Sequence, residues 1–140
     1  MSFANAFAGH KILVVDDEPD SREVASILLE MAGAEVLVAS NGEQGLVAAR
    51  EHKPVFIRAD LSMPEMSGWQ MLHHLKQDET IADIPVIALT AHAMAGDKER
   101  VLAAGFYSYM AKPLRPETFV DDLLKIVAEI PAIAQTHNGN

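Results

Sequence analysis

The strongest constraint on the fold of this 140-residue chain is the alternation of short apolar segments with amphipathic helical patterns. The apolar segments have the length and composition of buried strands. Each one is followed by residues whose apolar positions recur at helical spacing. Parallel strands need such helical crossovers, and the helices then cover both faces of the sheet. We therefore expect an α/β fold with a doubly wound, five-stranded parallel sheet and five helices.

The same patterns place the individual elements. Strands are expected at residues 11–15, 36–39, 55–60, 84–89 and 107–110. Helices are expected to begin near Pro19, Asn41, Ser67, Ala95 and Pro116, which are residues typical of helix starts or lie at the first apolar-periodic position.

The length of the chain is that of a single domain. We expect a folded domain at residues 11–130, preceded by an N-terminal extension at 1–10. Pro131 is expected to end the last helix, so that 131–140 forms a C-terminal tail, disordered over 132–140.

The charge balance restricts the partners. Eleven Lys and Arg residues face twenty Asp and Glu residues, giving a formal net charge of −9, so we expect no direct nucleic-acid binding. The absence of cysteine excludes disulfides, Cys-type zinc sites and thiol nucleophiles. No apolar run reaches the ~18 residues of a membrane span, and the N-terminus lacks a signal-peptide pattern. We expect a cytoplasmic protein without membrane insertion.

Polar residues of particular chemistry follow the expected strands. Asp16 and Asp17 follow the first strand, and Asp60 ends the third. Ligands of open α/β sheets bind beyond the carboxyl ends of the strands. If the first and third strands are neighbours, three carboxylates lie within several ångströms and need a counter-ion. Mg²⁺ fits this need, because it uses one or two carboxylates together with phosphate oxygens.

Thr90 and Lys112 follow the fourth and fifth strands at the same edge. A hydroxyl and an ammonium group are suited to hold the oxygens of a transferring phosphoryl group. A carboxylate can be the nucleophile of such a transfer and become an aspartyl phosphate. Paired acids are also typical of a solvated helix N-terminus, but the coincidence of Asp60, Thr90 and Lys112 favours the phosphoryl site.

Four segments at these strand ends resemble the receiver domain of bacterial two-component response regulators, and in particular the chemotaxis regulators. They are VVDDEP at 14–19, DLSMPEMSGW at 60–69, ALTA at 88–91 and AKP at 111–113. The resemblance covers about residues 11–130 and implies the flavodoxin-like strand order 2-1-3-4-5.

The resemblance assigns reactive and switching roles. Asp60 would be the phospho-acceptor, and Thr90 and Lys112 would complete the catalytic set. Thr90 and Tyr109 would move together as a switch. The peptide bond before Pro113 would be cis.

The resemblance also implies a metal site and two tuning positions. Asp17 would bind Mg²⁺ directly, Asp16 through water, and Ser62 through its backbone carbonyl, and Asp60 would also belong to the metal site. Ser62 and His92 match positions that tune the lifetime of the phosphoryl group in this family.

The function implied is that of a stand-alone response regulator. It would take a phosphoryl group from a sensor histidine kinase or phosphotransfer protein, and a phosphorylation-dependent surface would signal to a downstream protein target. The surface would comprise the fourth helix, fifth strand and fifth helix, and a homodimer through it is left open. The chain would not be a metabolic enzyme, and its chemistry would be Mg²⁺-dependent self-phosphorylation and autodephosphorylation at Asp60.

Two other classes are weighed against this interpretation. A phosphatase or flavin protein of the same fold is disfavoured, because D-x-D-x-T is absent around Asp16 and no phosphate-binding loop follows the first strand. A pseudo-receiver would act as a constitutive interaction module, with Arg58 locking the site.

Arg58 is unusual because it lies in an otherwise apolar part of the third strand, two residues before Asp60. A buried unpaired charge is costly, so Arg58 must pair with a carboxylate, extend to solvent or lie under thin helix cover. Our hypothesis is that it reaches toward the acid cluster and partly replaces the metal charge.

Overall fold

The computed structural model describes residues 5–91 and 95–138. Within them, five parallel strands form one sheet in the order β2-β1-β3-β4-β5. The strands are β1 (Lys11–Val15), β2 (Glu35–Ala39), β3 (Phe56–Asp60), β4 (Val86–Thr90) and β5 (Ser108–Ala111). The strand order implied by the resemblance is confirmed, and every strand boundary lies within two residues of the expected one.

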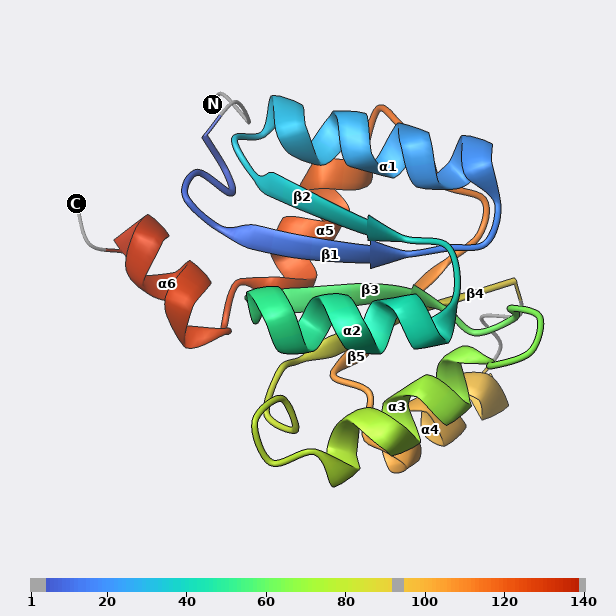
Figure 1. Ribbon diagram of the computed structural model, residues 1–140. Helices are drawn as coiled ribbons and strands as arrows, with labels where there is room; N and C mark the ends of the chain where they lie inside the picture. The colour runs from blue at the N-terminus through green and yellow to red at the C-terminus, as the bar shows by residue number, and fades with distance from the viewer. Residues whose placement is uncertain (1–4, 92–94, 139–140) are drawn as a thin grey trace.

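Helices cover both faces of the sheet (Figure 1). They are α1 (Pro19–Met31), α2 (Gly42–His52), α3 (Gly68–Gln77), α4 (Ala95–Ala104), α5 (Phe119–Val127) and α6 (Pro131–Asn138). One face carries α1 and α5, and the other carries α2, α3 and α4. The doubly wound architecture is therefore as expected. None of the described helices is long and apolar enough to cross a membrane.

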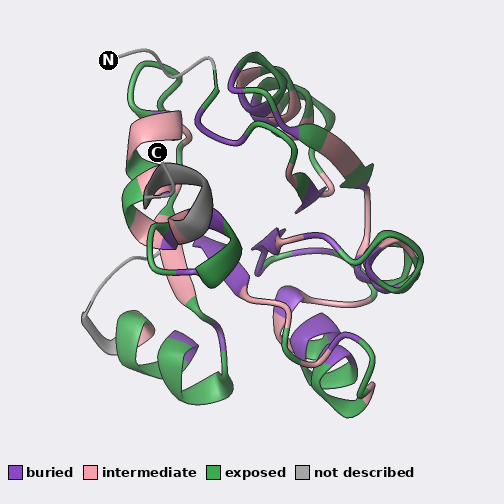
Figure 2. Cartoon of the chain, turned by 90° about the vertical axis from the view of Figure 1, so that its left-hand side faces the viewer, coloured by how far each residue is buried: buried purple, intermediate pink, exposed green. Residues whose placement is uncertain are grey.

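The core consists of two apolar clusters, one on each face of the sheet. Alternation along β3 supplies both, because Ile57 and Ala59 belong to the cluster under α2 and α3, whereas Phe56 belongs to the cluster under α1 and α5. Figure 2 shows the resulting pattern, in which buried residues lie on the strands and on the inner sides of the helices. Arg58 has the parity of Phe56 and lies on the α5 side.

Two helix starts follow the expected capping chemistry. The Asn41 side chain accepts a hydrogen bond from the backbone N–H of Gln44 at 2.8 Å. Ser67 and Gln70 form a complete capping box at the start of α3. These caps fix where α2 and α3 begin, and thus how the loops after β2 and β3 return to the sheet.

The expectation of a disordered tail over 132–140 was wrong for residues 132–138, which belong to a helix. Pro131 does not end the last helix but begins a sixth one, α6, a position where the fixed φ of proline is favourable. Ile130 and Ile133 are buried in the α1–α5 cluster together with Phe7. Burial of these apolar side chains stabilises the folded tail. The short apolar pattern of the tail did not indicate this burial. The preceding helix, α5, begins at Phe119, three residues after Pro116.

The N-terminal extension packs against the same end of the sheet. Phe7 is fully buried, and its ring meets Phe56 edge to face at a centroid distance of 5.9 Å. Its backbone N–H donates to the carbonyl of Ala32 at 2.9 Å. Together with α6, this segment covers the amino ends of the strands and leaves the carboxyl ends for chemistry (Figure 1).

Candidate functional site

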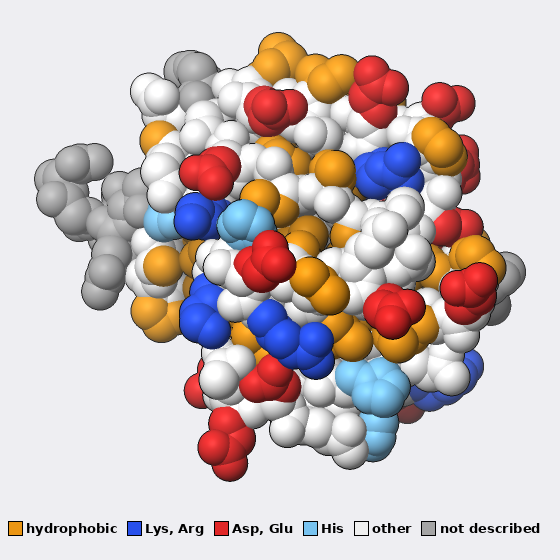
Figure 3. Space-filling model, viewed as in Figure 1, with side chains coloured by type: hydrophobic (Ala, Val, Ile, Leu, Met, Phe, Trp, Pro, Cys, Tyr) orange, Lys and Arg blue, Asp and Glu red, His pale blue; other side chains and the backbone are white. Residues whose placement is uncertain are grey.

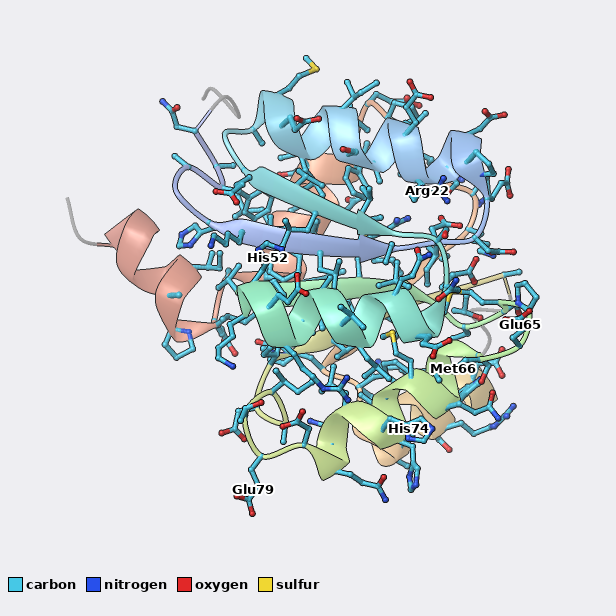
Figure 4. The ribbon with its side chains drawn as sticks, viewed as in Figure 1. Arg22, His52, Glu65, Met66, His74 and Glu79 are labelled. Carbon is cyan, nitrogen blue, oxygen red and sulfur yellow. The ribbon has the colours of Figure 1, made fainter. Side chains whose placement is uncertain are left out.

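The sequence-predicted residues meet at the carboxyl edge of the sheet. Parallel pairing aligns Asp60 with Leu89 and Thr90 with Ala111, so the loops that follow β1, β3, β4 and β5 leave the sheet at one edge. In Figure 4, Arg22 of α1 lies on one side of this edge, and Glu65 and Met66 of the β3–α3 loop lie on the other.

Three carboxylates form the centre of the site. Asp16, Asp17 and Asp60 each offer an oxygen atom, and these atoms lie within 4.8 Å of one another. Asp16 and Asp60 are buried, whereas Asp17 is half-buried. Like charges this close repel in the absence of a cation. The donor set is all oxygen and opens to solvent at Asp17, which fits a hard divalent cation such as Mg²⁺ that keeps part of its water shell.

Asp16 is already held by its neighbours. One carboxylate oxygen accepts from the backbone N–H of Glu18 at 2.9 Å, and the other accepts from the Ser21 hydroxyl at 2.6 Å. Arg22 donates from its guanidinium to the Asp16 backbone carbonyl at 2.8 Å. Both Asp16 oxygens thus accept hydrogen bonds from residues of the segment that joins β1 to α1 and of the first turn of α1. The sequence analysis missed Ser21 and Arg22, although their positions in the first turn of α1 were a signal.

Asp60 is paired with Lys112. The Lys112 ammonium donates to one Asp60 oxygen at 2.8 Å, and the Ser62 backbone N–H donates to the other at 2.9 Å. The backbone N–H of Lys112 donates to the Thr90 carbonyl at 2.8 Å, which fixes the chain that carries the ammonium. The Lys112–Pro113 peptide is cis, as the resemblance implies.

Gly68 determines how closely the loop after β3 folds back. A Cβ atom at this position would lie 2.5 Å from the Asp60 carbonyl oxygen and 2.9 Å from Leu61 Cα. Both neighbours are backbone atoms, so neither can rotate away. The missing side chain lets α3 start directly behind Asp60, and the Gly68 N–H donates to the Leu61 carbonyl at 3.0 Å.

The remaining expected residues take separate places. Thr90 is buried at the end of β4, at the same edge of the sheet as the acid cluster. Tyr109 is half-buried on β5 and packs against the cluster under α2 and α3. Ser62 is exposed after Asp60. His92 lies outside the described residues.

Arg58 does not make the contacts that the sequence suggested. Its side chain is 1% exposed, so extension to solvent is wrong. None of its three guanidinium nitrogens has a hydrogen-bond partner among the described residues, so it is not paired with Asp16 or Asp60. Its guanidinium carbon lies 5.2 Å from the centroid of the Phe119 ring, which packs over it from α5. Burial lowers the pKa of Arg58, whereas the charges of Asp16 and Asp60 act in the opposite direction.

A cavity of about 310 Å³ adjoins the site between α1 and the loop after β5. Asp16, Ser21 and Lys112 are among its lining residues. Asp16 and Lys112 connect this cavity to the acid cluster, and Val24, Leu89 and Leu114 form part of its apolar wall.

Comparison with known families and proteins gives one consistent result. The sequence model described as "Response regulator receiver domain" matches residues 12–124. The chain is 37% identical over 112 residues to the polar-differentiation response regulator DivK of Brucella anthropi, covering 80% of this chain and 91% of that protein. DivK of Brucella ovis matches over the same shares with the same identity.

Solved structures agree with this result. Chemotaxis protein CheY4 of Vibrio cholerae is 29% identical, with a TM-score of 0.78, over 85% of this chain and 99% of that chain. The receiver domain of sensor histidine kinase PA1611 of Pseudomonas aeruginosa is 30% identical, with a TM-score of 0.75, over 87% of this chain and all of that one. That structure holds a magnesium ion coordinated in its active site cleft.

Proposed function

Because the chain belongs to the family of response regulator receiver domains, we propose that Asp60 accepts a phosphoryl group from a sensor histidine kinase or a phosphotransfer protein. The observation that carries this proposal is the contact between Asp60 and Lys112, at 2.8 Å, beside the carboxylates of Asp16 and Asp17. The proposal is supported by the proximity of a carboxylate, an ammonium group and two further carboxylates at one edge of the sheet.

The acid cluster would hold Mg²⁺. Asp17, Asp60 and the backbone carbonyl of Ser62 would bind it directly, and Asp16 would contact it through water. Bound Mg²⁺ would supply positive charge to the oxygens of the transferring phosphoryl group. The magnesium ion in the related receiver of Pseudomonas aeruginosa supports this assignment.

The chain's own groups would perform the transfer as follows. A carboxylate oxygen of Asp60 attacks phosphorus, a new O–P bond forms, and the P–N bond to the donor histidine breaks with its electron pair on the imidazole. Lys112 moves its ammonium from the carboxylate to a phosphoryl oxygen, and Thr90 donates its hydroxyl to another. Hydrolysis reverses the state: water attacks phosphorus, the O–P bond to Asp60 breaks, and inorganic phosphate leaves, which restores the Asp60 carboxylate.

The output would be a change of surface. Phosphorylation adds negative charge and strong acceptor oxygens at Asp60, and Thr90 and Tyr109 would respond together. The altered face would comprise α4, β5 and α5 and would bind a downstream protein target unequally in the two states. Ser62 and His92 would tune the lifetime of the phosphorylated state. The alternative of a pseudo-receiver locked by Arg58 is not favoured, because Arg58 leaves the acid cluster uncontacted.

The test is the intact mass of the protein after incubation with Mg²⁺ and a small phosphodonor such as phosphoramidate. We expect a gain of one phosphoryl group that requires Mg²⁺, is removed by hydroxylamine and is lost in Asp60→Asn. The matched control is Asp83→Asn, an exposed carboxylate outside the site, which should still be phosphorylated. A gain that persists in Asp60→Asn, or that does not need Mg²⁺, would contradict the proposal.

A further inference from the structure

A second cavity, of about 430 Å³, lies between the sheet and α5. The segment 112–114 lines both this cavity and the one beside the acid cluster, but the other lining residues differ. Apolar side chains from β5, α5 and the loop between them form much of its wall, namely Met110, Leu114, Phe119 and Ile126. Its volume is in the range that accommodates small organic molecules.

Arg58 lines this cavity and is its most unusual member. The side chain is 1% exposed, and its guanidinium nitrogens have no hydrogen-bond partner among the described residues. The Phe119 ring supplies a cation–π contact at 5.2 Å, but it accepts none of the five N–H bonds that guanidinium can donate. A buried cation in this condition has a strong unmet preference for an anion.

The charges around the cavity also favour an anion. Arg115 and Lys112 line it in addition to Arg58, against one acidic residue, Asp122. Lys112 is engaged by Asp60, and Asp122 is exposed. Basic residues thus outnumber acidic ones in the cavity lining, in a chain whose formal net charge is −9; Asp16 and Asp60, whose charges also act on Arg58, do not line this cavity.

We propose that this cavity is a binding site for a small organic carboxylate. The two carboxylate oxygens would accept paired hydrogen bonds from Arg58, a geometry that guanidinium matches closely. The apolar body of the ligand would pack against Phe119 and Leu114. The site is separate from the phospho-acceptor chemistry and does not depend on it.

The proposal is tested by titrating the full chain with benzoate and following the backbone amide signals by NMR. We expect saturable shifts at cavity residues such as Leu114 and Thr118. Benzamide has the same shape without the charge, and its affinity should be lower than that of benzoate by about tenfold or more. The comparison of these two probes uses only the unaltered protein, so it does not depend on any variant that fails to fold.

Variants then locate the binding. Arg58→Leu should weaken benzoate binding about tenfold or more, and Arg58→Met repeats the test with an unbranched side chain. Lys125→Gln, an exposed position of α5 outside the cavity, should bind benzoate as the unaltered protein does. Asp60→Asn should also retain binding, which separates this site from the phospho-acceptor.

Four results would overturn the site. They are equal binding of benzoate and benzamide, undiminished binding in both Arg58 variants, shifts confined to the edge that carries Asp16 and Asp60, and no saturable shift at all. A failure of Asp60 phosphorylation in the mass experiment would leave these measurements unaffected, so the two proposals fail separately.

Discussion

Gly68 shows how a single missing side chain can position a reactive group. Its ideal Cβ would lie 2.5 Å from the backbone oxygen of Asp60. We expect Gly68→Ala to lower the free energy of unfolding by about 1–3 kcal/mol, since backbone must shift to relieve the overlap. It should also weaken Mg²⁺ binding, because the displaced backbone carries Asp60. Urea denaturation and calorimetric titration measure the two effects.

The matched control for this prediction is Gly42→Ala, at the first position of α2. Its Cβ would lie 2.8 Å from the Met66 sulfur and 3.1 Å from Met66 Cβ; these are side-chain atoms, and the sulfur end of this flexible side chain can rotate away. We expect a loss of less than about 1 kcal/mol at Gly42. Equal losses of unfolding free energy in the two variants would show that overlap with backbone at Gly68 is no more destabilising than overlap with a side chain at Gly42.

Arg58 carries a positive charge near the site but makes no hydrogen bond to the carboxylates of Asp16 or Asp60. It lies two residues before Asp60 on the same side of β3, roughly 6 to 7 Å away along the strand. We expect Arg58→Leu to strengthen Mg²⁺ binding about three- to tenfold, because a positive charge near the carboxylates is removed. Titration of Mg²⁺ at constant ionic strength measures the change. An unchanged affinity would show that the Arg58 charge is screened from the site.

At the scale of elements, α6 adds stability to the end of the sheet opposite the site. Ile133 is fully buried. We expect Ile133→Ala to cost about 2–4 kcal/mol of unfolding free energy, as for other buried isoleucines, and to leave Mg²⁺ affinity unchanged. Ile27→Ala is the control, because Ile27 is 47% exposed on α1 and should cost less than about 1 kcal/mol. No loss at Ile133 would mean that the tail is disordered, as the sequence alone suggested.

Asp78 joins α2 to the end of α3 and makes stability depend on pH. Hydrogen bonds from the Thr80 side chain, and then from Arg50, lower the pKa of Asp78 to about 2, from an ordinary value of 3.8. A lowered pKa in the folded state stabilises the protein above the unfolded pKa, and this contribution is lost as the pH falls from about 4 to 2.

We therefore expect Asp78→Asn to destabilise the protein at pH 6, by a small amount because the pair is solvent-exposed. The difference between the variant and the unaltered chain should shrink as the pH falls below 4 and should be smaller at high salt. Urea denaturation between pH 2 and 6 measures it. Asp83→Asn in the same loop is the control, and a gap that stays constant with pH would contradict the assignment to Asp78.

The elements that the sequence predicted well are those with a complete local signal. β1 has a continuous apolar run, and Asn41 and Ser67 supply caps that their partners three residues later complete. Ile130, just before α6, and Ile133 within it are buried in an apolar cluster that also contains Phe7, more than 120 residues earlier in the chain. Such distant packing leaves no periodic signal, so the tail could not be distinguished from a disordered one.

The same contrast holds for the site. The proximity of Asp16, Asp60 and Lys112 was predictable, because each lies at the end of a strand or just after it and the sheet brings the strand ends together. The surroundings of Arg58 were not, because the position of Phe119 over its guanidinium depends on how α5 packs on the sheet. The sequence identified an improbable charge, but only packing shows that the charge is buried beside a cavity.

For the whole molecule, most acidic side chains are spread over the surface, whereas three of them, Asp16, Asp17 and Asp60, lie close together at the site. Figure 3 shows acidic side chains scattered across one complete face. The formal net charge of −9 adds a general attraction for cations. An experiment must therefore distinguish specific binding of Mg²⁺ from nonspecific screening by salt. Variants of the acid cluster do so, because only the specific effect of Mg²⁺ on stability should need that cluster.

We expect Mg²⁺ to raise the thermal unfolding midpoint. The three carboxylates lie together only in the folded protein, so the ion should bind the folded state and not the unfolded chain. A single site contributes about 2.7 kcal/mol when free Mg²⁺ is a hundredfold above its dissociation constant. Na⁺ at the same ionic strength should give a smaller rise, since it only screens the general repulsion. Asp17→Asn should abolish the Mg²⁺-specific part, whereas Asp83→Asn should keep it. An equal rise in both variants would mean that Mg²⁺ acts on the overall charge, and the acid cluster would then hold no specific ion.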